Sequence, residues 1–239
     1  MKTKLEVDRF EAESSRRVSQ CQKCKGSLED CECSKIHIFE VAAFEACIPR
    51  DFWHFKSTDI EHNRRPFDQL VAPYLKRLNT AHKRGYGLLF SGPNGVGKTT
   101  FISYVLLRAI RRGKTAYYTT MLQLAHDIKS GFNDPEAQDR LEWMLTSDFF
   151  GLDEMGKEHH REASEQTFMK TQVEMILKRR FDECKPTLLG TNLDTSKFSA
   201  MYGTSVASMV SGKYRVVYME PGDIRKSKLA NRMNEEMGY

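Results

Sequence analysis

Short apolar runs alternate with longer stretches in which apolar residues recur every three or four positions, from residue 66 almost to the end of the chain. Apolar runs bounded by polar or turn residues are typical of buried strands, and the wider spacing is typical of amphipathic helices. The pattern predicts strands at Gly87–Phe90, Thr115–Thr119, Asp148–Leu152, Pro186–Thr191 and Tyr214–Met219. Strands that alternate with helices in this way predict an α/β fold, with a parallel sheet covered by helices on both faces.

Helices are expected between these strands and on either side of them. The first predicted helix begins at Pro66 and ends at Gly85. The others span Lys98–Arg112, Met121–Lys129, Pro135–Leu145, Glu165–Phe181, Thr195–Met201, Ser205–Val210 and Lys226–Glu236. Residues 1–20 lack apolar periodicity and are interpreted as a tail or a short helix, and residues 38–63 as a linker with scattered aromatic side chains. The chain is therefore predicted to have an N-terminal module, residues 1–47, followed by one α/β domain, residues 48–239.

The composition narrows the class of protein. Of 239 residues, 40% are hydrophobic and 29% are charged, which is typical of a globular protein. No apolar run approaches the roughly 18 residues of a membrane-spanning helix, and residues 1–17 lack the apolar core of a secretion signal, so we expect a cytoplasmic protein with no membrane partner. The net charge is +5, and residues 1–50 contain nine basic and nine acidic residues. The positive excess thus lies in the α/β domain, where it favours weak, salt-sensitive binding of DNA.

Four of the six cysteines are clustered near the N-terminus, with the spacing Cys21-x2-Cys24-x6-Cys31-x-Cys33. Four thiolates form the ligand set of a closed tetrahedral zinc site. The residues between them are too polar to form a hydrophobic core, so a metal would organise what burial cannot. The cluster predicts a Zn²⁺ site, with His37 in reserve if Cys31 or Cys33 is not a ligand. The alternative is a leader of reduced thiols without a metal. The other two cysteines are interpreted as small core residues.

The segment after the first predicted strand matches the phosphate-binding pattern G-x-x-x-x-G-K-[ST]. It consists of Gly92, Pro93, Asn94, Gly95, Val96, Gly97, Lys98 and Thr99, and Thr100 follows it. The glycines allow the backbone to curl with its N–H groups towards phosphate oxygens, and the helix that follows adds the positive end of its dipole. Lys98 is expected to neutralise the β- and γ-phosphates of ATP, and Thr99 to offer its hydroxyl to Mg²⁺. The strand before the loop and the helix after it make a plain glycine-rich turn the weaker interpretation.

Two carboxylates, Asp153 and Glu154, end the third predicted strand. In a protein with a phosphate loop, an acidic residue at a strand end supports Mg²⁺, and its neighbour is placed to act as a base towards the attacking water. We therefore assign Asp153 to Mg²⁺, and Glu154 to catalysis together with Lys98. Asn192, at the end of the fourth strand, is expected to hold the attacking water. Its alternative role is to cap the following helix.

These motifs resemble the AAA+ ATPases of the DnaC/DnaI helicase-loader group, which includes the IstB transposition helpers. The resemblance covers about residues 48–225 and rests on Ser91–Thr99, Phe149–Glu154, Gly190–Asn192 and the segment Tyr214–Arg225. It implies a five-stranded sheet of order 5-1-4-3-2, no helical lid domain, and ATP bound at an interface between subunits of an oligomer. It also implies that the N-terminal module binds a replicative DNA helicase and that the core contacts single-stranded DNA. Arg225 matches the arginine that ends the family pattern and contacts the nucleotide; the alternative is a surface charge.

One position departs from the pattern of this group. Relatives usually carry a Ser-Arg pair in the helix before the last strand, and that arginine reaches the γ-phosphate held by the neighbouring subunit; here the pair is Ser208-Met209. Because such an arginine contributes roughly 10³–10⁵ in rate, either Lys213 or Arg215 replaces it, or hydrolysis is weak. The expected function is an ATP-dependent helicase loader for DNA replication. The alternatives are an IstB-type transposition helper that binds duplex DNA and a transposase, and an ATP-switched adaptor with little hydrolysis.

Overall fold

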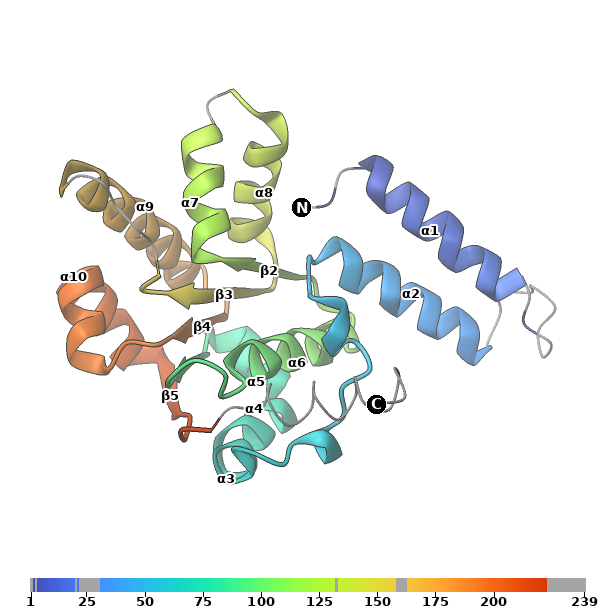
Figure 1. Ribbon diagram of the computed structural model, residues 1–239, viewed down its shortest axis with the longest axis horizontal. Helices are drawn as coiled ribbons and strands as arrows, with labels where there is room; N and C mark the ends of the chain where they lie inside the picture. Colours follow the sequence, from blue (N-terminus) through green and yellow to red (C-terminus); the bar gives the residue numbers. More distant parts are fainter. Residues whose placement is uncertain are drawn as a thin grey trace, which may run out of the picture.

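The fold is built on a sheet of five parallel strands in the order β2-β3-β4-β1-β5 (Figure 1). The computed structural model describes residues 2, 4–19, 21, 31–131, 133–157 and 163–222, with only the backbone described at 17, 18 and 163–165. The strands are β1 Gly87–Ser91, β2 Ala116–Thr120, β3 Phe149–Met155, β4 Thr187–Thr191 and β5 Tyr214–Tyr218. The predicted α/β class and the implied strand order are both confirmed.

Helices cover both faces of the sheet (Figure 1). On one face α6, Lys98–Ile110, packs against the central strands, and α2, Glu32–Glu45, packs against α6. The other face carries α7 Met121–Ser130, α8 Pro135–Thr146, α9 Ala163–Asp182 and α10 Thr195–Lys213. Each face buries its own hydrophobic cluster, so strands β1, β3 and β4 are buried on both sides, as is typical of parallel sheets. Among the described helices, none is long and apolar enough to cross a membrane.

The helix predicted from Pro66 to Gly85 is divided into short pieces. The region before β1 contains η1 Arg50–Phe52, η2 Ser57–Asp59, α3 Arg64–Pro66, the π-helical η3 Phe67–Val71, α4 Ala72–Lys76 and α5 Leu78–Arg84. Arg77 separates the last two with φ −108° and ψ 30°, and Gly85 ends α5 at φ 69°. In α10, Gly203 has φ 89° and ψ 166°, and this kink separates the two helices predicted there. The helix expected at 226–236 lies outside the described residues.

The prediction of a linker over residues 38–63 is wrong at its start, because α2 continues to Glu45. Phe39 and Ala43 of α2 are buried in the same cluster as α6, and the guanidinium of Arg111 lies 3.9 Å from the centre of the Phe39 ring. Helix α2 packs against α1 as well as α6. Its apolar residues are therefore spread over more than one face, and no single amphipathic stripe marks it in the sequence.

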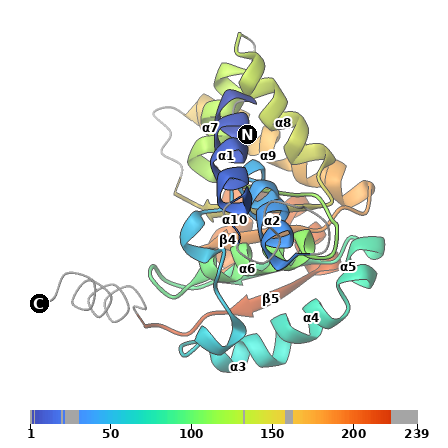
Figure 2. The same ribbon diagram turned by 90° about the vertical axis from the view of Figure 1, so that its right-hand side faces the viewer.

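Helix α1, Lys4–Ser19, packs along α2, and the two lie side by side in Figures 1 and 2. Of the two interpretations of residues 1–20, the helix is the one observed. Phe10 is buried, with its ring stacked on Phe44 at 4.5 Å between centroids and edge-on to Trp53 at 5.8 Å. These aromatic contacts fasten the N-terminal helices to the segment that leads into the α/β domain.

A buried arginine joins α8, α9 and β4. Arg180 is 0% exposed, and its guanidinium donates to the carbonyl oxygens of Met144, Ser147 and Pro186 and to Thr187 Oγ1, at distances of 2.7 to 3.0 Å. Burial lowers the pKa of Arg180 to about 10, so the side chain keeps its charge at neutral pH. One side chain thus satisfies backbone carbonyls from several segments, of which the carbonyl of Pro186 also accepts from the N–H of Phe150.

Replacing Arg180 by leucine should lower the free energy of unfolding by about 3 kcal/mol, because each buried carbonyl left without a donor costs about 1–3 kcal/mol. Arg179→Leu is the matched control, since Arg179 is exposed and pairs with Glu183 at the surface; its effect should stay within about 1 kcal/mol. Urea titrations followed by circular dichroism measure both variants. Equal losses in the two would contradict the role assigned to Arg180.

Candidate nucleotide-binding site

The phosphate loop connects the carboxyl end of β1 to α6, which begins at Lys98 as predicted. Gly95 and Gly97 have φ angles of 82° and 95°, a left-handed backbone that residues with a side chain rarely adopt. Val96, between them, is fully buried. The side chain of Val96 therefore anchors the loop in the hydrophobic core.

The side chain of Lys98 folds back onto the first residues of the phosphate loop. Its Nζ donates hydrogen bonds of 2.7 Å to the carbonyl oxygens of Gly92 and Pro93, and the residue is 8% exposed. Thr99 and Thr100 follow it in the first turn of α6. An ammonium group at the N-terminus of a helix, beside a loop of backbone N–H groups, is suited to bind phosphate.

The two side chains assigned to Mg²⁺ are hydrogen-bonded to each other. Thr99 Oγ1 donates to Asp153 Oδ2 at 2.5 Å, although the residues are 54 positions apart. Asp153 is 1% exposed, and the N–H of Glu154 donates to its Oδ1 at 2.8 Å. A hydroxyl and a carboxylate side by side next to a phosphate loop fit Mg²⁺, which prefers oxygen ligands and often shares them with substrate phosphates.

Gly190 of β4 makes room for this carboxylate. Strand β4 pairs with β3, and a Cβ at position 190 would overlap Asp153 Oδ1 and lie 2.9 Å from Ile102 Cδ1. The glycine is therefore required by close packing against Asp153, the side chain predicted to bind Mg²⁺. The sequence motif around Asn192 included Gly190 but did not reveal this reason.

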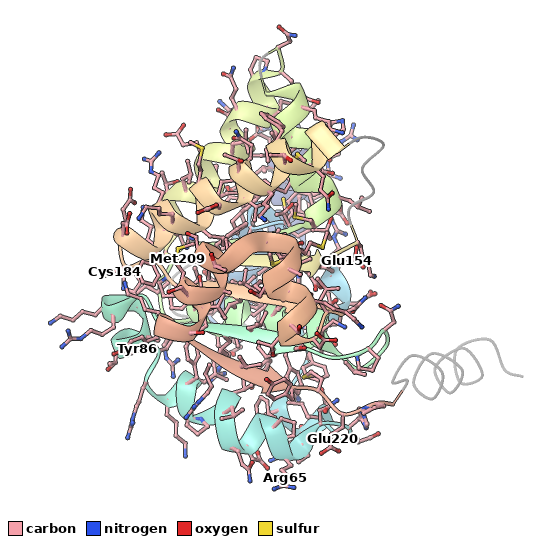
Figure 3. The ribbon with its side chains drawn as sticks, turned by 90° about the vertical axis from the view of Figure 1, so that its left-hand side faces the viewer. Arg65, Tyr86, Glu154, Cys184, Met209 and Glu220 are labelled. Carbon is pink, nitrogen blue, oxygen red and sulfur yellow. The ribbon has the colours of Figure 1, made fainter. Side chains whose placement is uncertain are left out.

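A bulge at the end of β3 turns Glu154 out of the strand. The pairing of β3 with β4 shifts in register between Leu152 and Met155, and Glu154 has a φ of 61°. Bulges beside active sites redirect side chains in this way. The Glu154 carboxylate, labelled in Figure 3, forms a 2.7 Å ion pair with Lys157, and both side chains are about one-third exposed. Lys157 was not expected at this position from the sequence.

Asn192 lies beside the phosphate loop. Its Nδ2 donates to Asn94 Oδ1 at 2.8 Å. The alternative role, capping the next helix, is filled by Asp194, which accepts from the N–H of Lys197 at 2.8 Å. The structure thus brings the loop, the Thr99–Asp153 pair and Asn192 together at the carboxyl edge of the sheet.

The family model described as IstB-like ATP binding protein matches residues 55–210. This range is more than half of the chain and contains the phosphate loop, Asp153, Glu154 and Asn192. The chain belongs to the IstB-like ATP-binding family. No curated protein matches it.

Solved structures of replication proteins share the fold of this IstB-like protein. The DnaC helicase loader has a TM-score of 0.61 at 19% identity, over 72% of this chain and 100% of that one. DnaI has a TM-score of 0.59 at 17% identity, over 73% and 93%. A replication initiator DnaA bound to AMPPCP and single-stranded DNA has a TM-score of 0.56 at 15% identity; the match covers 79% of this chain and 56% of DnaA. The resemblance inferred from the motifs, to the DnaC/DnaI and IstB group, is confirmed at the level of family and fold.

Besides Lys157, the sequence analysis of this IstB-like site missed His62 and Asn63. Asn63 is 5% exposed; its Nδ2 donates to Val96 O at 3.0 Å, and its Oδ1 accepts from the N–H of Glu220 at 2.7 Å. His62 Nε2 lies 2.9 Å from Glu220 O. The pair joins the phosphate loop to the segment after β5, where Figure 3 labels Glu220. Asparagine tolerates the left-handed φ of 60° found here, but this preference alone does not identify its partners.

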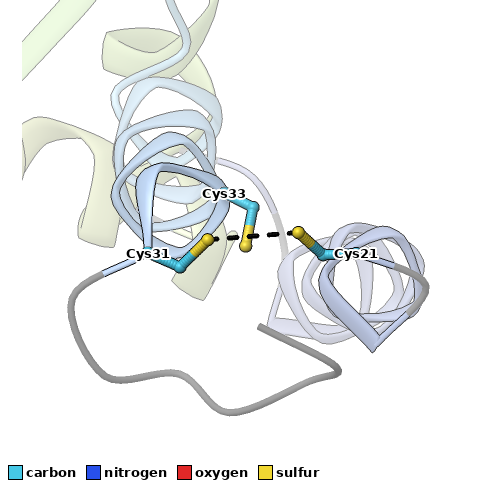
Figure 4. Close-up of side chains that lie close together, drawn as sticks. All are labelled: Cys21, Cys31 and Cys33. Carbon is cyan, nitrogen blue, oxygen red and sulfur yellow. Dashed lines mark hydrogen bonds between the residues drawn. The ribbon is translucent and has the colours of Figure 1, made fainter. Parts of the chain in front are cut away.

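Three of the four predicted zinc ligands converge between the end of α1 and the start of α2 (Figure 4): Cys21, Cys31 and Cys33. Their Sγ atoms lie within 4.8 Å of one another, which fits a metal with Zn–S bonds of about 2.3 Å. Cys24 lies outside the described residues. His37, the reserve ligand, faces α1 instead, with Nδ1 at 2.7 Å from Ser14 Oγ.

The position of the missing arginine lies in the second half of α10 (Figure 3). Met209 packs against the hydrophobic cluster on that face of the sheet. Of the two candidate substitutes, Lys213 donates to Phe181 O at 2.8 Å, whereas Arg215 of β5 is exposed to solvent. Arg225 lies outside the described residues.

Gly190→Ala should destabilise the protein by about 1–3 kcal/mol through overpacking, and it should weaken Mg²⁺-dependent nucleotide binding because Asp153 must move. Gly212→Ala in α10 is the matched control: nothing lies within 4 Å of its added Cβ, so its effect should be neutral or stabilising by less than about 1 kcal/mol. Calorimetric melting and nucleotide titration measure the two effects. Wild-type stability and affinity in Gly190→Ala would exclude the packing role of Gly190.

Proposed function

We propose that this IstB-like protein is a cytoplasmic ATPase that loads a replicative DNA helicase onto single-stranded DNA. Residues 48–239 form the ATPase domain in this proposal, and residues 1–47 form the module that binds the helicase. The supporting observation is the Thr99–Asp153 pair next to a complete phosphate loop, with Glu154 turned out by a bulge. Hydrolysis requires these features in addition to nucleotide binding.

Each residue of the site has a role in this proposal. Residues 92–100 bind the nucleotide phosphates, and Lys98 neutralises their charge. Thr99 and Asp153 hold Mg²⁺, which when bound offsets the negative charge on the phosphate oxygens. Glu154 accepts a proton from the attacking water, which Asn192 helps to hold. In the structure, Oε1 of the Glu154 carboxylate is paired with Lys157.

Glu154→Gln should reduce ATP turnover by at least about 100-fold, because glutamine keeps the size of the side chain but cannot accept the proton. ATP affinity should stay within about twofold, since no phosphate contact is assigned to Glu154. Glu142→Gln, on the exposed face of α8, is the control and should behave as wild type. Phosphate release and the binding of a fluorescent ATP analogue measure the two properties. Normal turnover in Glu154→Gln would disprove the assigned base.

The proposed active form is an oligomer in which ATP bridges neighbouring subunits. Met209 cannot neutralise the negative charge that develops on the phosphoryl group during its transfer, and a cation at this position would stabilise that charge. Arg215 is proposed as the substitute, because it is exposed on β5, an edge strand of the sheet. In this arrangement hydrolysis depends on contact between subunits.

We further propose that the cysteine cluster binds Zn²⁺, with Cys24 as the fourth ligand. Thiolates are the ligands that structural zinc prefers, and the three described sulfurs already converge. Because the cluster lies at the junction of α1 and α2, a bound metal would cross-link the ends of both helices. The resulting rigid hairpin is the surface proposed for the helicase.

Purified protein should contain about one zinc per chain, as measured by plasma mass spectrometry. The double variant Cys21→Ser/Cys24→Ser should lose most of this zinc and capture less of the cognate helicase in a pull-down. Cys184→Ser, far from the cluster in sequence and structure, is the control and should keep both properties. Zinc-free wild-type protein would overturn the metal site, and undiminished capture by the double variant would remove the metal from helicase binding.

Two other functions are distinguished by DNA binding. A transposition helper that acts on duplex DNA is favoured by the IstB-like family match, and an ATP-switched adaptor is favoured by Met209. Fluorescence anisotropy with single-stranded and duplex oligonucleotides separates the proposed loader from the transposition helper. A preference for single strands supports the loader, and ATP-dependent filaments on duplex DNA support the helper. Absence of turnover with both DNA and helicase present supports the adaptor.

A further inference from the structure

Tyr118 connects the edge of the sheet to the Mg²⁺-binding carboxylate. It lies on β2 and is 8% exposed. Its phenol donates a hydrogen bond to Asp153 Oδ2 at 3.2 Å, and its backbone N–H donates to Ala46 O, just beyond α2, at 2.9 Å. Because β2 is an edge strand, this backbone bond fixes the position of Tyr118 from the side where no further strand pairs.

We infer that Tyr118 is a positioning residue of the Mg²⁺ site, whose phenol O–H fixes the Asp153 carboxylate in the orientation that lets Asp153 and Thr99 hold the metal together. The inference rests on the proposed ATPase function and adds to it a residue outside the phosphate loop and the β3 motif. Tyr118 itself does not contact the metal.

The hydrogen bonds of Asp153 account for this role. Oδ1 accepts from the N–H of Glu154, and Oδ2 accepts from both Thr99 and Tyr118. A hydroxyl that binds a metal through its oxygen can still donate its proton, so Thr99 can serve Mg²⁺ and Asp153 at once. Of the two hydroxyl groups that donate to Oδ2, that of Tyr118 is not a metal ligand. It therefore keeps the carboxylate oriented before and after the metal binds.

An ordinary tyrosine phenol has a pKa of about 10, so Tyr118 keeps its proton across the physiological range and can donate it to Asp153. Groups that hydrogen-bond to metal ligands orient them in many metal sites, and their removal commonly costs 10–100-fold in metal affinity or activity.

Tyr118 also has a packing role, and phenylalanine would preserve it. Its ring lies opposite Gly151 on the neighbouring strand, and a Cβ at Gly151 would lie 3.5 Å from the ring. Tyr118→Phe keeps the ring and the backbone bond to Ala46 and removes only the hydroxyl. The variant therefore separates positioning of the carboxylate from packing.

Tyr104→Phe is the matched control. Tyr104 is also 8% exposed and belongs to the same hydrophobic cluster on α6, but its ring packs against Phe55 and Phe67. Both variants remove one phenol oxygen from this cluster. Differences between them therefore report on the hydrogen bond to Asp153.

The experiment titrates a fluorescent ATP analogue onto the full chain, first in EDTA and then at increasing Mg²⁺. Tyr118→Phe should bind the analogue in EDTA within about twofold of wild type and should need on the order of 10-fold more Mg²⁺ for half of the metal-dependent gain in affinity. Tyr104→Phe should match wild type. Electron paramagnetic resonance of Mn²⁺ bound with nucleotide gives a readout independent of turnover, in which the Tyr118→Phe spectrum should be changed. Melting temperatures confirm that both variants are folded.

An unchanged Mg²⁺ requirement and Mn²⁺ spectrum in Tyr118→Phe would overturn the inference and leave the ATPase proposal intact. Equal loss of affinity with and without Mg²⁺ would also overturn it, because the phenol would then support the nucleotide site as a whole. Wild-type protein that binds no nucleotide under any condition would instead refute the proposed function on which the inference rests.

Discussion

The buried carboxylate of Asp153 is the group on which the arrangement of the site depends. At 1% exposure it has lost its hydration, and a buried charge is tolerated only where donors or a metal replace the water. The donors come from the end of β3, the start of α6 and the middle of β2, while β4 contributes Gly190, which leaves space for the carboxylate. Adjacent strands in the order β2-β3-β4 bring these groups together. The site is thus a consequence of sheet topology as much as of the phosphate loop.

The N-terminal helices are packed onto this sheet by apolar and aromatic contacts. Phe10 and Phe39 join the cluster that contains α6, and the carbonyl of Ala46 takes the N–H of Tyr118. The chain after α2 therefore satisfies part of the open edge of β2, an edge that would otherwise be available for pairing with another strand. The cysteine cluster, α2, β2 and Asp153 form a continuous series of contacts from the N-terminal hairpin to the candidate nucleotide site.

Local patterns predicted most of the α/β domain, and they failed where packing partners are distant. The strands and the longer helices were predicted because each carries its own periodicity. Helix α2 was missed because it buries residues against both α1 and α6. The helix expected from Pro66 to Gly85 is divided at Arg77, where no glycine marks the break. In the site, Asn63 and Lys157 were missed because neither belongs to a contiguous motif.

The residues alone were enough to identify the phosphate loop, the acidic residues after a buried strand, the cysteine spacing and the succession of strands and helices along the chain. These features are encoded within short segments, where spacing and residue type follow directly from backbone geometry. Which side chains meet became known only from the folded chain: Tyr118 contacts Asp153, Asn63 contacts Val96 and Glu220, and Arg180 contacts four backbone carbonyls. Several of these contacts join residues 33 to 157 positions apart. They arise because buried polar groups need partners, and the fold determines which partners are within reach.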